Sequence, residues 1–150
     1  MDTPKGKEIL FHNEEVDFKL PNAELLKDWI QAVAKNEGKA TGDLNIVLCS
    51  DAYLHSLNIE FLGHDTLTDI ITFPFGEDEL EGDIFISLDR IRENAQIYKV
   101  DLLTELHRVI IHGVLHLCGY TDNSKEEQLV MRQKEDDSLA LLNQTNKQDN

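Results

Sequence analysis

Two histidines stand four residues apart in an apolar stretch of the chain, HGVLHLCGYTD, which covers residues 112–122. Successive residues of a helix are rotated by about 100°, so His112 and His116 would lie about 40° apart on one face, a turn from each other. This spacing lets two imidazoles approach one cation from the same side. It therefore predicts a metal site on a helix.

A carboxylate follows the second histidine after a short turn. Gly119 can end the helix and fold the chain back, so that Asp122 presents a third ligand. A His, His, Asp set would leave a fourth position for water, as in catalytic zinc sites, although Ni²⁺ or Mn²⁺ would also suit these ligands. The spacing alone leaves a second interpretation open, in which both histidines are hydrogen-bonded structural residues.

The residue after the first histidine restricts the chemistry. In the H-E-x-x-H pattern of metallopeptidases this residue is a glutamate that acts as general base, whereas here it is Gly113. A peptidase of that kind is disfavoured, and metal-activated water attacking a phosphodiester stays open. His107 would lie on the opposite face and Cys118 points away, while His12 and His55 are expected to be surface or structural residues.

The elements that must position these residues follow from periodicity. Strands are predicted at 8–13, 44–50, 69–75 and 82–87, and helices at about 22–38, 51–62, 88–100, 102–117 and 124–142. The last two strands should form a hairpin, with Pro74 indicating an edge. Asn22 and Asp51 are expected to cap helices, and Ser124 with Glu127 to form a capping box. The expected inward positions of helix 51–62 are Leu54, Leu57, Asn58, Phe61 and Leu62.

This order predicts a single α+β domain over residues 1–150, with a polar tail from about 143. The start MDTPKGKEILF lacks the features of a secretory signal, and no apolar run approaches the ~20 residues of a membrane span. We therefore expect a cytoplasmic protein without a membrane partner. Cys49 and Cys118 are expected to be reduced, packed thiols.

Charge argues in another direction. The chain carries 14 basic and 29 acidic residues, a net charge of −15. Taken alone, this disfavours a nucleic-acid partner, because phosphate binding draws on Lys and Arg. The cations expected near a cleft are Lys99, Arg90, Arg92 and Arg108.

Three ordered blocks resemble the YbeY endoribonucleases, also called rRNA maturation factors. HGVLHLCGYTD matches the first nine positions of the family signature H-G-x-L-H-L-x-G-Y-D-H. Residues 57–75 resemble L-N-x-x-Y-R-x-x-D-x-P-T-D-V-L-S-F-P, and residues 81–87 resemble L-G-D-I-x-I-S.

The resemblance implies a small, mostly parallel four-stranded sheet with one antiparallel strand, surrounded by about five or six helices. It also implies one zinc per chain, single-strand-specific RNA cleavage in rRNA processing and ribosome quality control, and the small ribosomal subunit as partner, with a ribosomal or GTPase protein as a further one.

Departures from the family pattern concern the site itself. The third family histidine falls on Asp122, which can still ligate zinc, and the family arginine falls on Leu62. His64 is the nearest polar residue to replace that arginine. Thr68 and Asp69 are retained, either as a turn or as groups that orient water or substrate. Asp83 is expected either in a structural turn or as a hydrogen-bond partner of a ligating imidazole.

Three functions remain open at this stage. The first is a metal-dependent single-strand endoribonuclease that acts through His112, His116 and Asp122, with Thr68, Asp69 and His64 assisting. The second is another metallohydrolase. The third is a non-catalytic ribosome-assembly factor with a structural metal, which accounts better for the acidic surface and for Leu62.

Overall fold

The computed structural model describes residues 8–76 and 79–148. The start of the chain that bears on a secretory signal, the middle of the acidic hairpin loop and the last two residues of the polar tail lie outside this part. Within it, four strands and five helices confirm the predicted α+β class.

The sheet has the order β1-β2-β4-β3. Its strands are β1 (Ile9–Glu14), β2 (Thr41–Cys49), β3 (Ile70–Pro74) and β4 (Leu80–Ser87). β1, β2 and β4 run parallel, whereas β3 pairs antiparallel with β4 as the predicted hairpin. Pro74 ends the edge strand β3, where its missing N–H leaves no ladder bond unmade.

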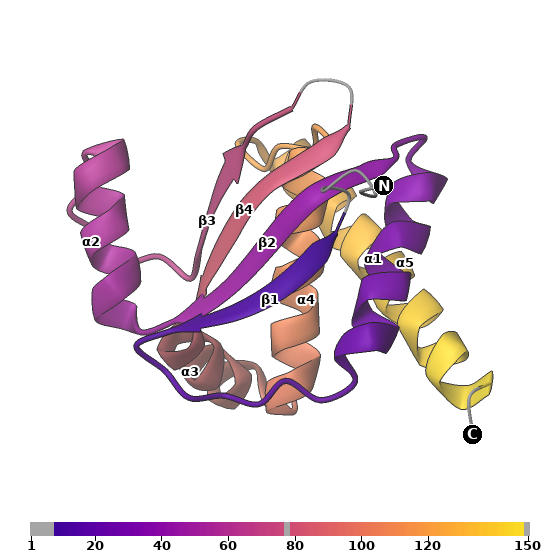
Figure 1. The fold of residues 1–150 in the computed structure, drawn as a ribbon, viewed down its shortest axis with the longest axis horizontal. Helices are drawn as coiled ribbons and strands as arrows, with labels where there is room; N and C mark the ends of the chain where they lie inside the picture. Colours follow the sequence, from indigo (N-terminus) through magenta and orange to yellow (C-terminus); the bar gives the residue numbers. More distant parts are fainter. Residues whose placement is uncertain (1–7, 77–78, 149–150) are drawn as a thin grey trace, which may run out of the picture.

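The helices are α1 (Ala23–Asn36), α2 (Asp51–Leu62), α3 (Leu88–Tyr98), α4 (Leu102–Leu117) and α5 (Lys125–Gln148). Figure 1 shows α3 and α4 behind the sheet, α1 and α5 beside the β1 edge, and α2 beside β3. The main core lies between the sheet and α1, α4 and α5, and α2 covers a smaller cluster around Leu54 and Ile71.

Helix α4, which carries both histidines, packs directly against the sheet. Ile110, Ile111 and Val114 are fully buried. Gly113 faces β3 and β4, where an added Cβ would come within 2.9 Å of both Ile70 Cδ1 and Ile84 Cγ2. Gly113 is therefore explained by the close approach of helix and sheet, which leaves His112 and His116 on the flank of the helix.

The helix caps were predicted correctly in one case and wrongly in two. Ser124 accepts from the Glu127 N–H while Glu127 accepts from the Ser124 N–H, which confirms the capping box. Asn22 has a left-handed backbone (φ 58°) and makes no side-chain cap, because capping geometry needs an extended residue. Ser50, not Asp51, caps α2 by accepting from Tyr53 N–H.

Two further expectations were wrong. Phe61 and Leu62 are exposed, because they lie in the last turn of α2, where an edge contact between the rings of Phe61 and Phe73 on β3 leaves both side chains open to solvent. The last helix, predicted over 124–142, is longer than expected: α5 continues through the polar tail as far as Gln148, since no Gly or Pro interrupts it and Thr145 Oγ1 donates to the Leu141 carbonyl.

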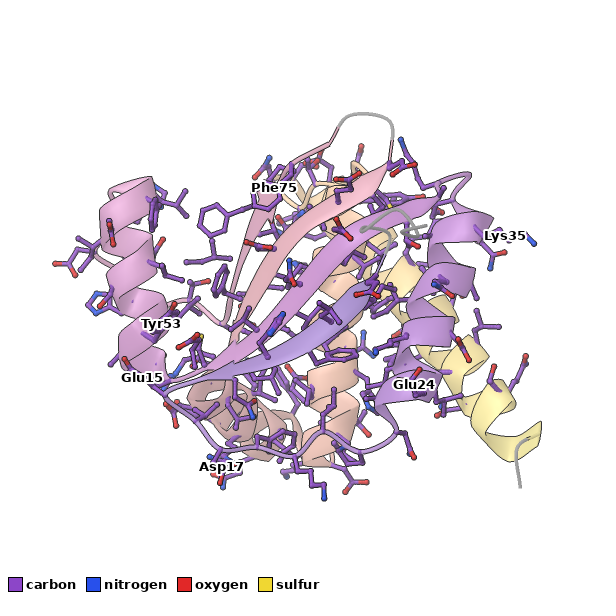
Figure 2. The ribbon with its side chains drawn as sticks, in the orientation of Figure 1. Glu15, Asp17, Glu24, Lys35, Tyr53 and Phe75 are labelled. Carbon is purple, nitrogen blue, oxygen red and sulfur yellow. The ribbon has the colours of Figure 1, made fainter. Side chains whose placement is uncertain are left out.

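The surface carries the acidic excess. Glu15, Asp17 and Glu24 are exposed around the periphery in Figure 2. Among the helices in the described part of the chain, none has the length and apolarity that crossing a bilayer requires. Cys49 and Cys118 are both free, with Cys49 buried and Cys118 half-buried.

Candidate metal centre

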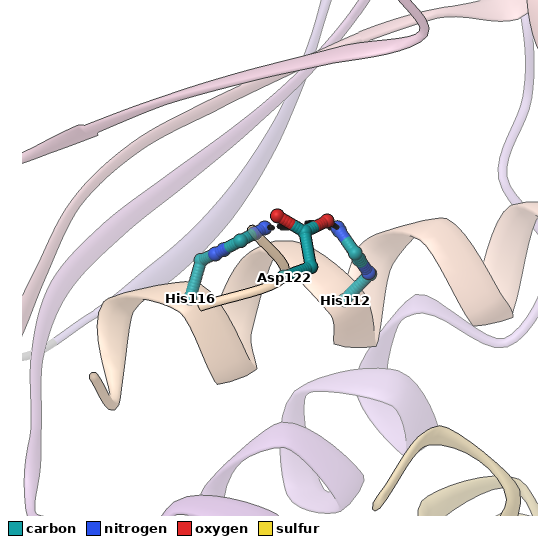
Figure 3. A group of neighbouring side chains, drawn as sticks. All are labelled: His112, His116 and Asp122. Carbon is teal, nitrogen blue, oxygen red and sulfur yellow. Dashed lines mark hydrogen bonds and ion pairs between the residues drawn. The ribbon is translucent and has the colours of Figure 1, made fainter. Parts of the chain in front are cut away.

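The two imidazoles of α4 meet at their Nε2 atoms. His112 Nε2 and His116 Nε2 lie 2.9 Å apart, and both side chains are about one-quarter exposed. Figure 3 shows the rings leaning toward one another over the helix, with the Asp122 carboxylate between them. Helical spacing thus places two nitrogen atoms at one solvent-accessible point.

Asp122 reaches the same point from beyond the end of α4. The helix ends at Leu117, and Gly119 takes a positive φ of 110° that turns the chain back. Asp122 Oδ2 then lies 3.5 Å from His112 Nε2 and 3.7 Å from His116 Nε2. Gln128 in α5 donates to the Asp122 carbonyl at 3.1 Å, which ties this turn to the last helix.

The second nitrogen of His116 is held by its own turn. His116 Nδ1 lies 2.9 Å from the Tyr120 carbonyl oxygen. A carbonyl can only accept, so Nδ1 carries the hydrogen and the Nε2 lone pair of the neutral ring faces the cluster. This is the tautomer that a metal ligand bound through Nε2 requires.

The second nitrogen of His112 is held by a residue far along the chain. His112 Nδ1 lies 2.7 Å from Glu135 Oε2 on α5. Glu135 is buried, and its Oε1 accepts from Arg108 Nη1 at 2.8 Å. Because a carboxylate accepts, Nδ1 of His112 donates, and its Nε2 is the atom turned toward His116 and Asp122.

The three side chains fit a zinc ion. Ligand atoms 2.0–2.1 Å from a tetrahedral zinc lie about 3.3 Å from one another, and the three separations here are 2.9, 3.5 and 3.7 Å. Two neutral rings with Nδ1 protonated would point their lone pairs at each other, so a proton or a cation must lie between them. Among the described residues, this is the cluster whose ligand atoms suit a metal ion.

A pocket of about 190 Å³ opens beside His112. Its lining residues come from the loop before β3, from α3, α4 and α5: Asp69, Asn94, Tyr98, Glu105, Arg108, Val109, His112, Arg132 and Glu135. The two arginines differ in their bonding. Arg108 is held by Glu135 and by Asp136, whereas Arg132 is 61% exposed and its nearest acid is Glu135 at 3.7 Å.

The electrostatics of this region follow from burial and pairing. Burial would lower the pKa of His112, but the hydrogen bond and charge of Glu135, with Asp122 and Asp69, raise it overall. Burial would raise the pKa of Glu135, but bonds to His112 and Arg108 lower it overall. Burial raises the pKa of Asp69, an effect that the positive charge of His112 only partly offsets.

The other predicted residues fall in different places. Asp69 lines the pocket with His112, whereas Thr68 donates to the nearby Ile70 carbonyl, a contact within its own turn. His64 is exposed after the end of α2, and its N–H donates to the Asn58 carbonyl. Leu62 is 46% exposed.

Residues predicted to lie outside the cluster do so. His107 packs edge-on against Trp29, and Cys118 packs against the core at the end of α4. Asp83, expected in a turn or beside a ligating imidazole, instead lies within β4 and accepts from Asn45 Nδ2. It lies on the opposite face of β4 from Ile84, the residue that meets α4, because strand side chains alternate.

Sequence reasoning missed Glu135 and Arg132. The buried residues of α5 include Met131, Glu135, Ser138 and Leu142, spaced four, three and four apart. This spacing describes one helix face, and a glutamate on a face that packs inward signals a buried partner. The spacing was visible in the sequence, but His112 could not be identified as the partner of Glu135 without knowing that α5 packs on α4.

The fold and the cluster together define a candidate metalloprotein with an open site at the end of a buried helix. A family model described as endoribonuclease YbeY matches residues 8–143. The chain belongs to this family, which confirms the resemblance seen in its three motif blocks.

Curated relatives agree over nearly the whole chain. Endoribonuclease YbeY of Amoebophilus asiaticus is 47% identical over 141 residues, covering 93% of this chain and 94% of the relative. The protein of the same name from Flavobacterium johnsoniae is 45% identical over 131 residues, covering 87% and 94%. The solution structure of TM1509 from Thermotoga maritima superimposes with a TM-score of 0.61 at 28% identity, covering 90% of this chain and 93% of that one.

Proposed function

We propose that this chain is a metal-dependent single-strand endoribonuclease that acts in rRNA maturation and ribosome quality control, with one zinc ion held by His112, His116 and Asp122. Membership of the endoribonuclease YbeY family supports the activity. The observation that supports the metal is the convergence of two histidine Nε2 atoms and one carboxylate oxygen on one point. Both imidazole rings are already oriented by hydrogen bonds through their Nδ1 atoms.

The bound metal would supply Lewis acidity, lowering the pKa of water and polarising a phosphate oxygen. The chain's own residues divide the remaining work. His116 and His112 hold their Nε2 atoms toward the ion through bonds to the Tyr120 carbonyl and to Glu135. Asp69, half-buried in the adjoining pocket with a raised pKa, is suited to orient substrate or to exchange a proton with it.

Phosphate contact needs a cation, and Leu62 does not supply one. Arg132 is the better-placed of the two pocket arginines, since Arg108 already makes two short ion pairs. A guanidinium at this position could donate to a phosphate beside the metal. We therefore assign substrate binding to Arg132 and not to His64.

Cleavage of single-stranded rRNA fragments by zinc-loaded protein tests the proposal. His116→Ala should abolish cleavage, while His55→Ala should leave it unchanged, because His55 pairs with Asp65 outside the cluster. Equal cleavage by wild type and His116→Ala would remove the proposed role of the metal.

A non-catalytic ribosome-assembly factor is the second candidate. The net charge of −15 and the exposed Leu62 favour it. In that case the zinc-loaded protein would bind small ribosomal subunits, alone or through a ribosomal or GTPase protein, and would cleave no RNA. Both candidates place the protein in the cytoplasm, where ribosomes are assembled.

A further inference from the structure

We propose that Glu135 is a positioning residue that fixes the ring of His112 and thereby strengthens metal binding, an inference that rests on the metal site proposed above. Glu135 lies 23 residues after His112 and on a different helix. Its side chain is only 7% exposed, and its Oε2 lies 2.7 Å from His112 Nδ1.

Burial makes this glutamate costly unless it is fully bonded. A buried carboxylate loses its hydration, which destabilises the fold unless partners replace the water. Here Oε2 accepts from His112 and Oε1 accepts from Arg108. An apolar residue at this position on the inner face of α5 would be buried without losing hydration. The bonds that Glu135 makes to the site therefore best explain why a carboxylate is present here.

The two ligating histidines are oriented by different parts of the chain. His116 is held by the Tyr120 carbonyl, four residues away in the turn that ends its own helix. His112 lies one turn earlier in α4, and the partner of its Nδ1 is a side chain of α5. The orientation of His112 therefore depends on α5 being docked with Glu135 in place.

Arg108 completes the arrangement. It lies one turn before His112 on α4 and donates through Nη1 to Glu135 and through Nη2 to Asp136. This pair of bonds holds the Glu135 carboxylate beside the helix that carries the histidines. Asp136 shares Arg108 but contacts neither imidazole, which makes it the matched control.

The test is zinc affinity, measured by competition with a chromophoric chelator on wild type, Glu135→Ala, Glu135→Gln and Asp136→Asn. Loss of a hydrogen-bond partner of a ligating histidine weakens metal binding by about 10- to 100-fold, which is expected for Glu135→Ala. Glu135→Gln should lose less, because its amide oxygen can still accept from His112 Nδ1. Asp136→Asn should stay within about twofold of wild type.

A second readout follows the rings directly. In the ¹⁵N spectrum of the zinc-loaded protein, the Nδ1 hydrogens of both histidines should be protected from exchange with water. Glu135→Ala should lose the His112 signal and keep that of His116, whose acceptor is a backbone carbonyl. A merely structural role for Glu135 would not separate the two rings.

The outcomes separate this inference from the proposed function. Wild type that binds no zinc would overturn both. Wild type and both Glu135 variants binding zinc equally would overturn only the role of Glu135. Far-ultraviolet circular dichroism of each zinc-free variant checks folding. If Glu135→Ala unfolds, the zinc affinity of the isosteric Glu135→Gln decides the question: a loss beyond that of Asp136→Asn supports the role of Glu135, and wild-type affinity overturns it.

Discussion

Gly113 lies against Ile84 so closely that a methyl group on its Cα would come within 2.9 Å of Ile84 Cγ2. This contact explains why a glycine follows the first histidine of the helix. The helix that carries the proposed ligands is pressed onto the sheet at that point, and a larger residue would lift His112 away from its partners.

Gly113→Ala should therefore destabilise the protein. Alanine favours a helix over glycine by about 1 kcal/mol, but overpacking a core costs about 1–3 kcal/mol, so we expect a net loss of about 1 kcal/mol in the free energy of unfolding. Urea denaturation measures it. In an Ile84→Ala background the penalty should shrink, and a stabilising Gly113→Ala in the wild-type background would show that the close packing is absent.

Asp69 should make zinc-free stability depend on pH. Burial raises its pKa above the usual 3.8, with His112 opposing the shift and Asp122 and Glu135 adding to it, and Glu105 is a further facing acid. Because the pKa of Asp69 is higher in the folded than in the unfolded chain, the ionised carboxylate destabilises the fold at a pH above the folded-state pKa. This destabilisation decreases as the pH falls and vanishes below 3.8, the ordinary pKa of the group.

Asp69→Asn should therefore raise the urea midpoint of the zinc-free protein at pH 7, and this advantage should diminish as the pH is lowered toward 3.8. The same variant should cleave RNA more slowly if Asp69 acts in the pocket. An advantage that grows on acidification would have the wrong sign and would contradict the burial argument.

Cys49 should be unreactive in the folded protein. Burial, followed by the charges of Glu15 and Asp51, raises its pKa to about 12. Since alkylation requires the thiolate, only about one thiol in 10⁴ is reactive at pH 8. Mass spectrometry after iodoacetamide treatment should show Cys49 modified far more slowly in the folded chain than in urea, whereas equal rates would mean that the thiol is exposed.

Arg132→Ala should weaken RNA binding without removing the metal. Loss of one charge-assisted hydrogen bond to phosphate is expected to raise KM for single-stranded RNA roughly tenfold. Arg92→Ala removes the same charge from an exposed position of α3 outside the pocket and serves as control. Equal effects of the two substitutions would reduce the role of Arg132 to general electrostatics.

Parts of the site were predictable because helical geometry is local. The i, i+4 spacing places His112 and His116 on one face wherever the helix lies, and Gly119 marks the turn that returns Asp122. Strand order near β3 and β4 followed from their short connection and from Pro74.

What escaped prediction depends on tertiary docking. Glu135 meets His112 only because α5 packs against α4, and no local pattern specifies that pairing. The prediction of the α2 cap failed for a different reason. Ser50 and Asp51 are both good capping residues, and only the backbone geometry selects between them. Phe61 and Leu62 fit an apolar helix face, but in the last turn of α2 the edge contact of Phe61 with Phe73 of β3 leaves both side chains exposed.

The zinc content of the purified protein decides whether His112, His116 and Asp122 together hold a metal ion. Elemental analysis of wild type and Asp122→Ala, each equilibrated with zinc and freed of excess, compares the three-ligand site with a two-histidine remnant. We expect about one zinc per chain in wild type and a marked loss in Asp122→Ala, because two imidazoles alone hold zinc weakly. Equal zinc in both proteins, or none in wild type, would show that these three side chains do not form the metal site.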